Sequence, residues 1–315
     1  MQRKKRKIIH IIIAGITFIV LLLSFVAFSF SRIVPSHAVE RAAIISDYGS
    51  TITIDGFDIW YNLLNESSPN SPIIVIAGGS GFSSDYIEGS LEFLAEEHPV
   101  LFFDARGCGR SQIKPDLSNY SIDKMSDELG ILKRVFFLDK KVIVLAHSFG
   151  GVIAMNYAAN NESDIEKMIL ISSADTNYKT HYTDAFFKAG LPPRDQEEAN
   201  QWYMDHIDIF FGRYFAVEEA KSIFDKTVTS YAVSAHVGGK SFDITDRIKN
   251  NSIPTLILVG GEREYPLTSI TVAQHLDDLF IDSVLINLPD SGHFMFAEKT
   301  DDFQRIIHEW IDKVK

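Results

Sequence analysis

A chain of 315 residues, of which 46 % are hydrophobic, is long enough for one large domain with a sizeable buried core and an insertion. Its formal net charge is −12 and no basic stripe follows the first seven residues, which argues against a nucleic-acid partner. A single cysteine, Cys108, excludes an intramolecular disulfide framework and any multi-cysteine metal site.

The N-terminal segment differs from the rest of the chain. Residues 1–7 carry five positive charges, and Ile8–Phe30 then runs for 23 residues without a formal charge. A helix of that length spans the roughly 30 Å hydrocarbon core of a bilayer. The basic block precedes the apolar run, so we predict a single-pass cell-membrane anchor at residues 1–31, with the remaining chain on the extracytoplasmic side. The alternative is a signal peptide cleaved near Ala38, whose apolar region would normally be only about 7–15 residues long.

Residues 32–47 are expected to form a linker, after which strands and helices alternate. Thr51–Leu64 has an alternating pattern around Asp55-Gly56, which is typical of a β-hairpin. Short apolar runs predict six buried strands at Ile73–Ala77, Val100–Phe103, Val142–Ala146, Met168–Ile171, Thr255–Val259 and Val284–Leu288. Helical patterns between and after them cover Asp85–Glu97, Ser121–Phe137, Gly150–Asn160, Thr268–Leu279 and Glu298–Val314. This order predicts an α/β fold with a mostly parallel eight-stranded sheet and helices on both faces, formed by residues 48–174 and 251–315.

Residues 175–250 interrupt this alternation. The segment contains 13 aromatic residues and no clear buried strand. Because it lies between two strand units, we predict an inserted helical cap over the site. Aromatic side chains of this cap would line an apolar pocket or form its own core, among them Tyr178, Tyr182, Phe186, Phe187, Trp202, Phe210 and Phe211.

The segment Val142–Gly151, VIVLAHSFGG, places a serine between a buried strand and the small residues that begin a helix. This is the pattern of a nucleophile elbow, G-x-S-x-G, with Ala146 in place of the first glycine. Small residues are needed because the turn is sharp and the strand and helix crowd together. The turn would lift the Ser148 hydroxyl above the sheet edge, so we predict that Ser148 is a nucleophile. An ordinary helix N-cap is the alternative interpretation.

Two other loops follow buried strands before the elbow. In Ile76–Tyr86, IAGGSGFSSDY, the glycines allow the backbone to approach a ligand, and we expect the Gly79 amide to form an oxyanion hole with the Phe149 amide. Phosphate binding is less favoured because the chain has no G-x-x-x-x-G-K-[ST] motif. The loop Phe103–Ser111, FDARGCGRS, is expected to be a structural turn without a chemical role.

A histidine follows the last predicted strand, in LPDSGHF at residues 288–294. A catalytic serine upstream and a histidine in this loop are the order that such a sheet requires. We therefore predict that His293 takes the proton from Ser148.

Together these motifs resemble the α/β-hydrolase superfamily from about Thr51 to Lys315. Within it, the chain is similar to the proline iminopeptidase-like branch of serine peptidases. The similarity is carried by AGGSGFSSDY, which matches that branch's H-G-G-P-G loop with Ala77 and Ser80 replacing His and Pro, and by DARGCGRS, HSFGG, FDITDRIKNNSIPTLILVGGERE and SGHF. The resemblance implies a Ser–His–acid triad that works without a metal ion or an organic cofactor.

The acid of this triad has several candidates. The relevant turn, residues 260–266, reads GGEREYP. A comparison without a gap places the family's aspartate at Arg263, whereas one inserted glycine matches GERE to G-E-x-D and gives Glu264. Counting back from the following proline favours Glu262, and Asp175 is a further source. We predict Glu264, since a glutamate can orient and charge-balance an imidazole.

The substrate class also stays open. The iminopeptidase branch binds the substrate's free amine with carboxylates, one of them just after the triad acid, where this chain has Tyr265. Acidic pairs in the insertion could replace it, although such pairs are usually solvated: Glu197, Glu198, Glu218 and Glu219. The sequence therefore predicts a hydrolase for short peptides or small molecules, either aminopeptidase-like or an esterase or lipase for amphiphilic esters. A catalytically silent binding protein is the third hypothesis, suggested by the irregular acid turn.

Overall fold

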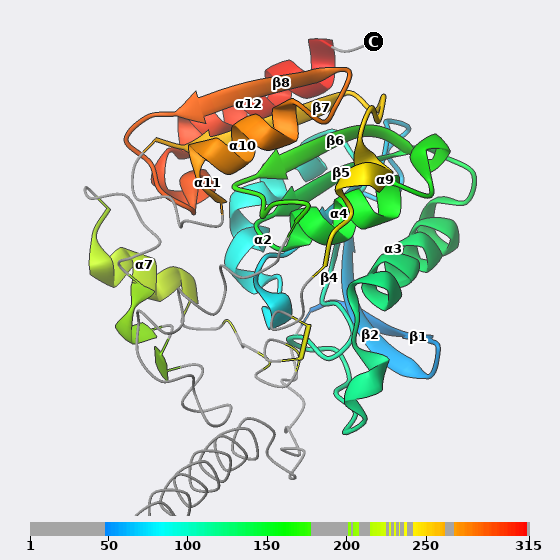
Figure 1. Cartoon of the computed structure of the whole chain (residues 1–315). Helices are drawn as coiled ribbons and strands as arrows, with labels where there is room; N and C mark the ends of the chain where they lie inside the picture. The colour runs from blue at the N-terminus through cyan, green and yellow to red at the C-terminus, as the bar shows by residue number, and fades with distance from the viewer. Residues whose placement is uncertain are drawn as a thin grey trace, which may run out of the picture. The chain divides into compact units, whose positions relative to one another are not determined.

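The computed structural model describes residues 48–177, 201–202, 204–207, 215–224, 227, 230, 233, 236–237, 242–261 and 268–313 (Figure 1). Within these residues eight strands form one sheet in the order β1-β2-β4-β3-β5-β6-β7-β8. The strands are β1 (Ser50–Ile54), β2 (Phe57–Leu64), β3 (Ile73–Ile76), β4 (Val100–Phe103), β5 (Val142–His147), β6 (Ile165–Ile171), β7 (Thr255–Gly260) and β8 (Ser283–Leu288). The predicted sheet is confirmed, with boundaries that differ from the predicted ones by three residues at most.

An antiparallel hairpin begins the sheet, as the sequence predicts. β1 pairs with β2, and β2 pairs with β4, both antiparallel, whereas the remaining strands run parallel to their neighbours. The two turn residues, Asp55 and Gly56, have φ angles of 50° and 76°. Both lie in the left-handed region that a two-residue hairpin turn of this kind requires, and aspartate and glycine tolerate it well.

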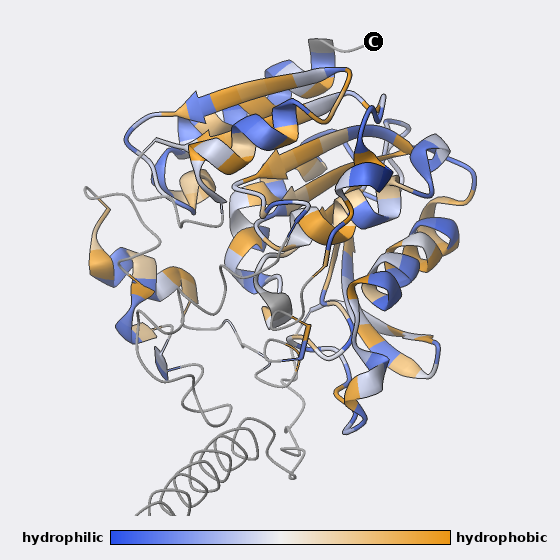
Figure 2. Ribbon diagram, in the orientation of Figure 1, coloured by the Kyte–Doolittle hydropathy of each residue, from blue (hydrophilic) through white to orange (hydrophobic). Residues whose placement is uncertain are grey.

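Helices cover both faces of the sheet (Figures 1 and 2). One face packs against α3 (Ile122–Phe137), α4 (Gly150–Ala158) and α10 (Ile270–Asp277). The other packs against α2 (Asp85–Leu91), the 3₁₀ helix η2 (Glu92–Glu96), α11 (Met295–Glu298) and α12 (Thr300–Lys313). The two apolar cores explain the strand composition: β3, β4 and β5 are buried along their whole length and therefore consist almost entirely of apolar residues.

One predicted helix is divided in the structure. The pattern at Asp85–Glu97 predicted one helix, but α2 ends at Leu91 and the chain continues as the 3₁₀ helix η2. The helix predicted from Glu298 corresponds to α12, which starts at Thr300, and the short helix α11 before it was not predicted. The predicted inward face of α12 is confirmed by buried Phe303 and Ile307.

Some predictions fall outside the described residues. These are the anchor at residues 1–31, the linker at 32–47 and most of the cap aromatics. None of the helices in the described ranges is both long and apolar enough to cross a membrane. The described part of the predicted insertion includes α7 (Val217–Phe224) and α9 (Thr245–Ile248).

Candidate active site

Ser148 stands directly after β5, in a strained turn. Its φ angle is 54°, although it is not a glycine. Its amide donates to the Ile171 carbonyl at 2.9 Å, and its carbonyl accepts from the Ala174 amide at 3.1 Å, so the end of β6 holds the turn in place. A left-handed residue with a side chain costs roughly 1–2 kcal/mol, and such strain concentrates at functional sites. The geometry is that of the predicted nucleophile elbow.

The two glycines after this serine are required by packing. A Cβ atom on Gly150 would lie 2.5 Å from the Ala77 carbonyl oxygen, at the end of β3. One on Gly151 would overlap the hydroxyl of Ser173, which follows β6. The start of α4 thus packs tightly between the ends of β3 and β6, the two strands on either side of β5, and Gly150 and Gly151 allow this close approach.

The glycine loop after β3 lies against the elbow. A Cβ atom on Gly78 would come within 2.9 Å of the Ser148 Cβ. The Gly78 amide is already engaged, since it donates to the Tyr86 hydroxyl at 2.5 Å. Gly79 begins the 3₁₀ helix η1 (Gly79–Gly81) with a φ of 61°, and it lines the same pocket as Phe149. The engaged Gly78 amide disfavours that group for the predicted oxyanion hole, in which the Gly79 and Phe149 amides stay the candidates.

His293 lies in the loop after β8 and is 5 % exposed. Its ring centroid is 4.6 Å from that of His147, the residue before the candidate nucleophile, so the elbow and the histidine loop are in contact. The Nδ1 atom of His293 is 3.2 Å from the Thr268 hydroxyl. Thr268 follows the turn that was predicted to supply the triad acid.

Of the three candidates for the triad acid, the structure describes only Asp175. Glu264 and Glu262 lie outside the described residues, and their assignment stays a prediction. Asp175, the third candidate, accepts a hydrogen bond from the amide of Thr176 at 2.6 Å, and its Oδ1 lies 2.8 Å from Nδ1 of His275 in α10. Its carboxylate thus contacts His275 rather than His293, which disfavours it as the acid.

The insertion reaches this site through α7 and the residues after it. The Phe224 ring packs edge to face on Phe294, next to His293, with 4.9 Å between ring centroids. The Thr227 hydroxyl donates to Asp85 at 2.9 Å, and the Ser230 amide donates to the Gly81 carbonyl at 2.8 Å. These contacts attach described residues of the insertion to the glycine loop. Glu218 and Glu219 of α7 are exposed.

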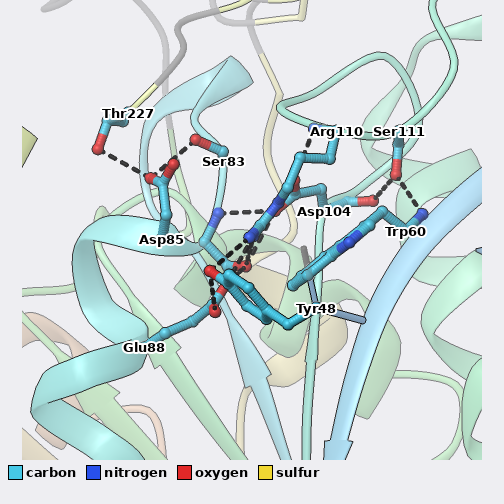
Figure 3. Close-up of polar contacts among 10 residues, drawn as sticks. Tyr48, Trp60, Ser83, Asp85, Glu88, Asp104, Arg110, Ser111 and Thr227 are labelled. Atoms are coloured by element: carbon cyan, nitrogen blue, oxygen red, sulfur yellow. Dashed lines mark hydrogen bonds and ion pairs between the residues drawn. The ribbon is translucent and has the colours of Figure 1, made fainter. Parts of the chain in front are cut away.

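The loop Phe103–Ser111 has a structural role, as predicted, but a larger one than a turn. Figure 3 shows a buried charged network around Arg110. Its guanidinium lies 2.8 Å from Asp104 and 2.5 Å from Glu88, and it stacks 3.2 Å above the Trp60 ring. Asp104 also accepts from the Ser84 amide at 2.7 Å, just before α2. We call these side chains, with Tyr48, the Arg110 network.

Tyr48, the first residue that the structure describes, completes the Arg110 network. Its hydroxyl donates to Glu88 at 3.1 Å, and its ring meets Trp60 edge to face at 5.7 Å. Burial raises the pKa of Glu88, and the positive charge of Arg110 opposes that shift without cancelling it. Burial alone would lower the pKa of Arg110, but the hydrogen bond and charge of Asp104 outweigh burial and raise it. The network thus connects β2, the loop after β4 and α2.

We expect Arg110→Met to destabilise the protein by about 3–5 kcal/mol, because it leaves the carboxylates of Asp104 and Glu88 buried without their cation. Urea denaturation followed by circular dichroism measures the loss. Arg305→Met is the matched control: its ion pairs with Asp302 and Glu309 lie on the exposed surface of α12, so the midpoint should hardly move. Equal, small shifts in both variants would show that the buried network contributes little.

The fold and the site can be compared with known proteins. A model of the alpha/beta hydrolase fold family matches residues 71–300, more than half of the chain. Among curated relatives, the proline iminopeptidase of Saccharolobus solfataricus is 27 % identical over 285 residues, covering 83 % of this chain and 91 % of the relative. The proline iminopeptidase of Thermoplasma volcanium is 26 % identical over 288 residues, covering 83 % and 96 %.

Solved structures agree on the fold. The esterase EaEST from Exiguobacterium antarcticum superposes with a TM-score of 0.71 at 20 % identity, covering 84 % of this chain and all of the esterase. A thermophilic esterase from Thermogutta terrifontis gives a TM-score of 0.70 at 20 % identity, covering 84 % and 97 %. With a serine elbow after the fifth strand and a family match across most of the sheet, the chain belongs to the α/β-hydrolase family and is a hydrolase.

Proposed function

We propose that this hydrolase cleaves an ester or amide bond through Ser148, His293 and an acid supplied by Glu264. The observation that carries the proposal is the elbow: Ser148 holds a left-handed conformation at the end of β5, with a φ of 54°. The histidine loop lies against the residue before it. A sharp strand-to-helix turn that presents a serine in this way is characteristic of nucleophilic acyl transfer.

The chemistry follows from the roles of these groups. His293 accepts the proton of Ser148 as the hydroxyl oxygen attacks the substrate carbonyl. The Gly79 and Phe149 amides stabilise the negative oxygen of the tetrahedral intermediate. His293 then donates the proton to the leaving alcohol or amine. A water molecule releases the acyl group by the same steps, with His293 again acting as base and then as acid.

The acyl group is proposed to be apolar. A pocket beside the candidate oxyanion hole is lined by Gly79 and Phe149 together with apolar side chains from three elements or loops, namely Phe103, Met125 and Ile153. A carbonyl bound by the two amides would direct its attached group toward this apolar surface. Such a surface suits an alkyl chain or a prolyl ring and disfavours a charged side chain.

We propose a proline iminopeptidase-like peptidase as the first candidate, supported by the relatives of that name, and an esterase as the second. An aminopeptidase needs a carboxylate facing the substrate's amine. Glu218 and Glu219 are exposed, and Glu218 pairs with Lys221 of the same helix at 3.2 Å, so these two offer no support for that role. Glu197 and Glu198 lie outside the described residues. The apolar lining of the pocket does not distinguish the two substrate classes.

A parallel assay distinguishes the candidates. The full-length protein is tested on proline arylamides with free and with acetylated amines, and on nitrophenyl esters of increasing acyl length. Cleavage of the arylamide that is lost on acetylation supports the peptidase, whereas turnover of esters alone supports the esterase. If no substrate is turned over and fluorophosphonate does not label the protein, the third hypothesis, a silent binding protein, replaces both.

We also propose that residues 1–31 anchor the protein in the cell membrane with the catalytic domain outside, on the basis of the charge asymmetry around Ile8–Phe30. Protease added to intact cells should release a fragment that begins within residues 32–47, detected by mass spectrometry of the supernatant. Complete protection of the domain in intact cells, with cleavage after lysis, would contradict this orientation.

A further inference from the structure

A chain of hydrogen bonds passes beneath the candidate site and connects its three loops. The Gly78 amide is 2.5 Å from the Tyr86 hydroxyl oxygen. That oxygen is 2.8 Å from Nδ1 of His147. The Nε2 atom of His147 is 3.0 Å from the backbone carbonyl of His293. Tyr86 is 3 % exposed and His147 is 1 % exposed, so the whole chain is shielded from water.

The chemistry of the two end groups fixes the direction of the outer two bonds, and the neutral state of His147 fixes the direction of the middle one. A backbone carbonyl only accepts, so Nε2 of His147 must carry a proton for His293. A backbone amide only donates, so the Tyr86 oxygen accepts from Gly78. Burial, together with the neighbouring His293, lowers the pKa of His147 well below its ordinary value and keeps the ring neutral. With its proton on Nε2, neutral His147 has no proton on Nδ1, which therefore accepts from the Tyr86 hydroxyl.

We propose that Tyr86 and His147 are positioning residues. They would fix the positions of the glycine loop at Gly78–Gly79, of Ser148 and of His293 relative to one another. The inference rests on the proposed function of Ser148 and goes one step beyond it. Tyr86 engages the Gly78 amide, which leaves the next amide, that of Gly79, as the one to face the oxyanion. His147 precedes Ser148 and holds the main chain of His293 itself. A displacement of about 1 Å in such a set of groups can cost on the order of 10²-fold in rate.

Aromatic side chains around this chain of hydrogen bonds keep it dry. The Tyr86 ring stacks on Phe224 of α7, with 5.4 Å between centroids and 12° between planes. Phe294 meets Tyr86 edge to face at 5.8 Å, and Phe296 meets His147 in the same way at 5.2 Å. Hydrogen bonds in such surroundings are stronger than in water, and losing one partner is correspondingly costly. The insertion therefore contributes one wall of the enclosure through Phe224.

Tyr86→Phe tests the proposal because it removes one oxygen and keeps the ring. For whichever nitrophenyl ester or proline arylamide the wild type turns over fastest, we expect kcat to fall about 10–100-fold. KM should stay within about twofold, because ground-state binding does not need the oxyanion hole. Affinity for an alkyl boronic acid, which forms a tetrahedral adduct with the serine, should fall by the same factor as kcat/KM.

Tyr157→Phe is the matched control. Tyr157 is also 3 % exposed, and its hydroxyl donates to Asp164 at 2.5 Å, away from the site. Its loss should lower stability without changing kcat or boronate affinity. A purely structural role for Tyr86 predicts that both variants behave alike.

A second pair of variants covers the case in which Tyr86→Phe does not fold. His147→Gln retains a donor and an acceptor on its amide, whereas His147→Leu retains only bulk. We expect Gln to recover at least part of the kcat that Leu loses. If Leu equals or exceeds Gln, or if Tyr86→Phe keeps wild-type kcat and boronate affinity, the positioning role is wrong. The proposed function fails separately, if Ser148→Ala keeps its activity.

Discussion

Ser148→Ala should reduce hydrolysis by about 10⁶-fold and abolish labelling by a fluorophosphonate probe, because the proposed acyl-enzyme forms on the Ser148 hydroxyl. The fold should be retained, since alanine meets the same left-handed constraint at φ 54° as serine does. Activity on the best substrate, labelling in gel and circular dichroism together measure the effect.

Ser172→Ala provides a matched control within the same sheet. Ser172 is also a left-handed serine after a buried strand, with a φ of 42° at the end of β6, and it is buried. It shares the backbone geometry of Ser148 without the proposed chemistry, so its variant should keep both turnover and labelling. Labelling that persists in Ser148→Ala would exclude Ser148 as the nucleophile.

Glu264→Gln should lower kcat by up to about 10⁴-fold, because the amide keeps the shape of the side chain but cannot balance the charge of the His293 imidazolium. KM for the same substrate should change much less. Single-turnover or steady-state kinetics of the purified variant measure the loss.

Two variants serve as comparisons for this prediction. Glu262→Gln should cost far less, since the alignment with one inserted glycine gives that residue no role in the triad. Asp175→Asn should also be mild, because the Asp175 carboxylate contacts His275. A crippling loss in either one, together with a mild Glu264→Gln, would reassign the acid while leaving the prediction for Ser148 and His293 in place.

The sheet could be predicted because its signals are local. Strands such as β4 and β5 are buried on both faces, so each is an uninterrupted apolar run with a recognisable end. The hairpin is marked by Asp55-Gly56, and the elbow by the small residues that crowding requires. Each of these features leaves its mark within about ten residues of sequence, even where the neighbour that crowds a glycine, such as Ala77 beside Gly150, is distant in the chain.

The break in the helix after Leu91 was missed for a related reason. The apolar spacing continues from Leu91 to Leu94, so periodicity gives no sign that the backbone tightens there into a 3₁₀ helix. Such breaks are decided by how the two halves pack on the sheet, and that packing is tertiary.

The polar interior was beyond the reach of local patterns. Arg110 and Glu88 are 22 residues apart, and Tyr48 is 62 residues from Arg110. Taken singly, charged residues are expected at the surface. Tyr86 and His147 were missed likewise, although one signal was available: His147 occupies the position before the nucleophile, where an otherwise apolar strand ends in a polar ring. The turn with Glu264 stays a prediction.

The position of Tyr48 limits how far the chain can be shortened from its N-terminus. The predicted linker ends one residue before it, yet its ring covers Trp60 and its hydroxyl reaches Glu88. The folded unit therefore begins at or before this tyrosine, ahead of the first strand. A truncation that starts at Ser50 would keep every strand of the sheet. It would still expose the side of the Trp60 ring and of the Arg110 guanidinium that Tyr48 covers. A domain boundary placed from secondary structure alone would leave out Tyr48.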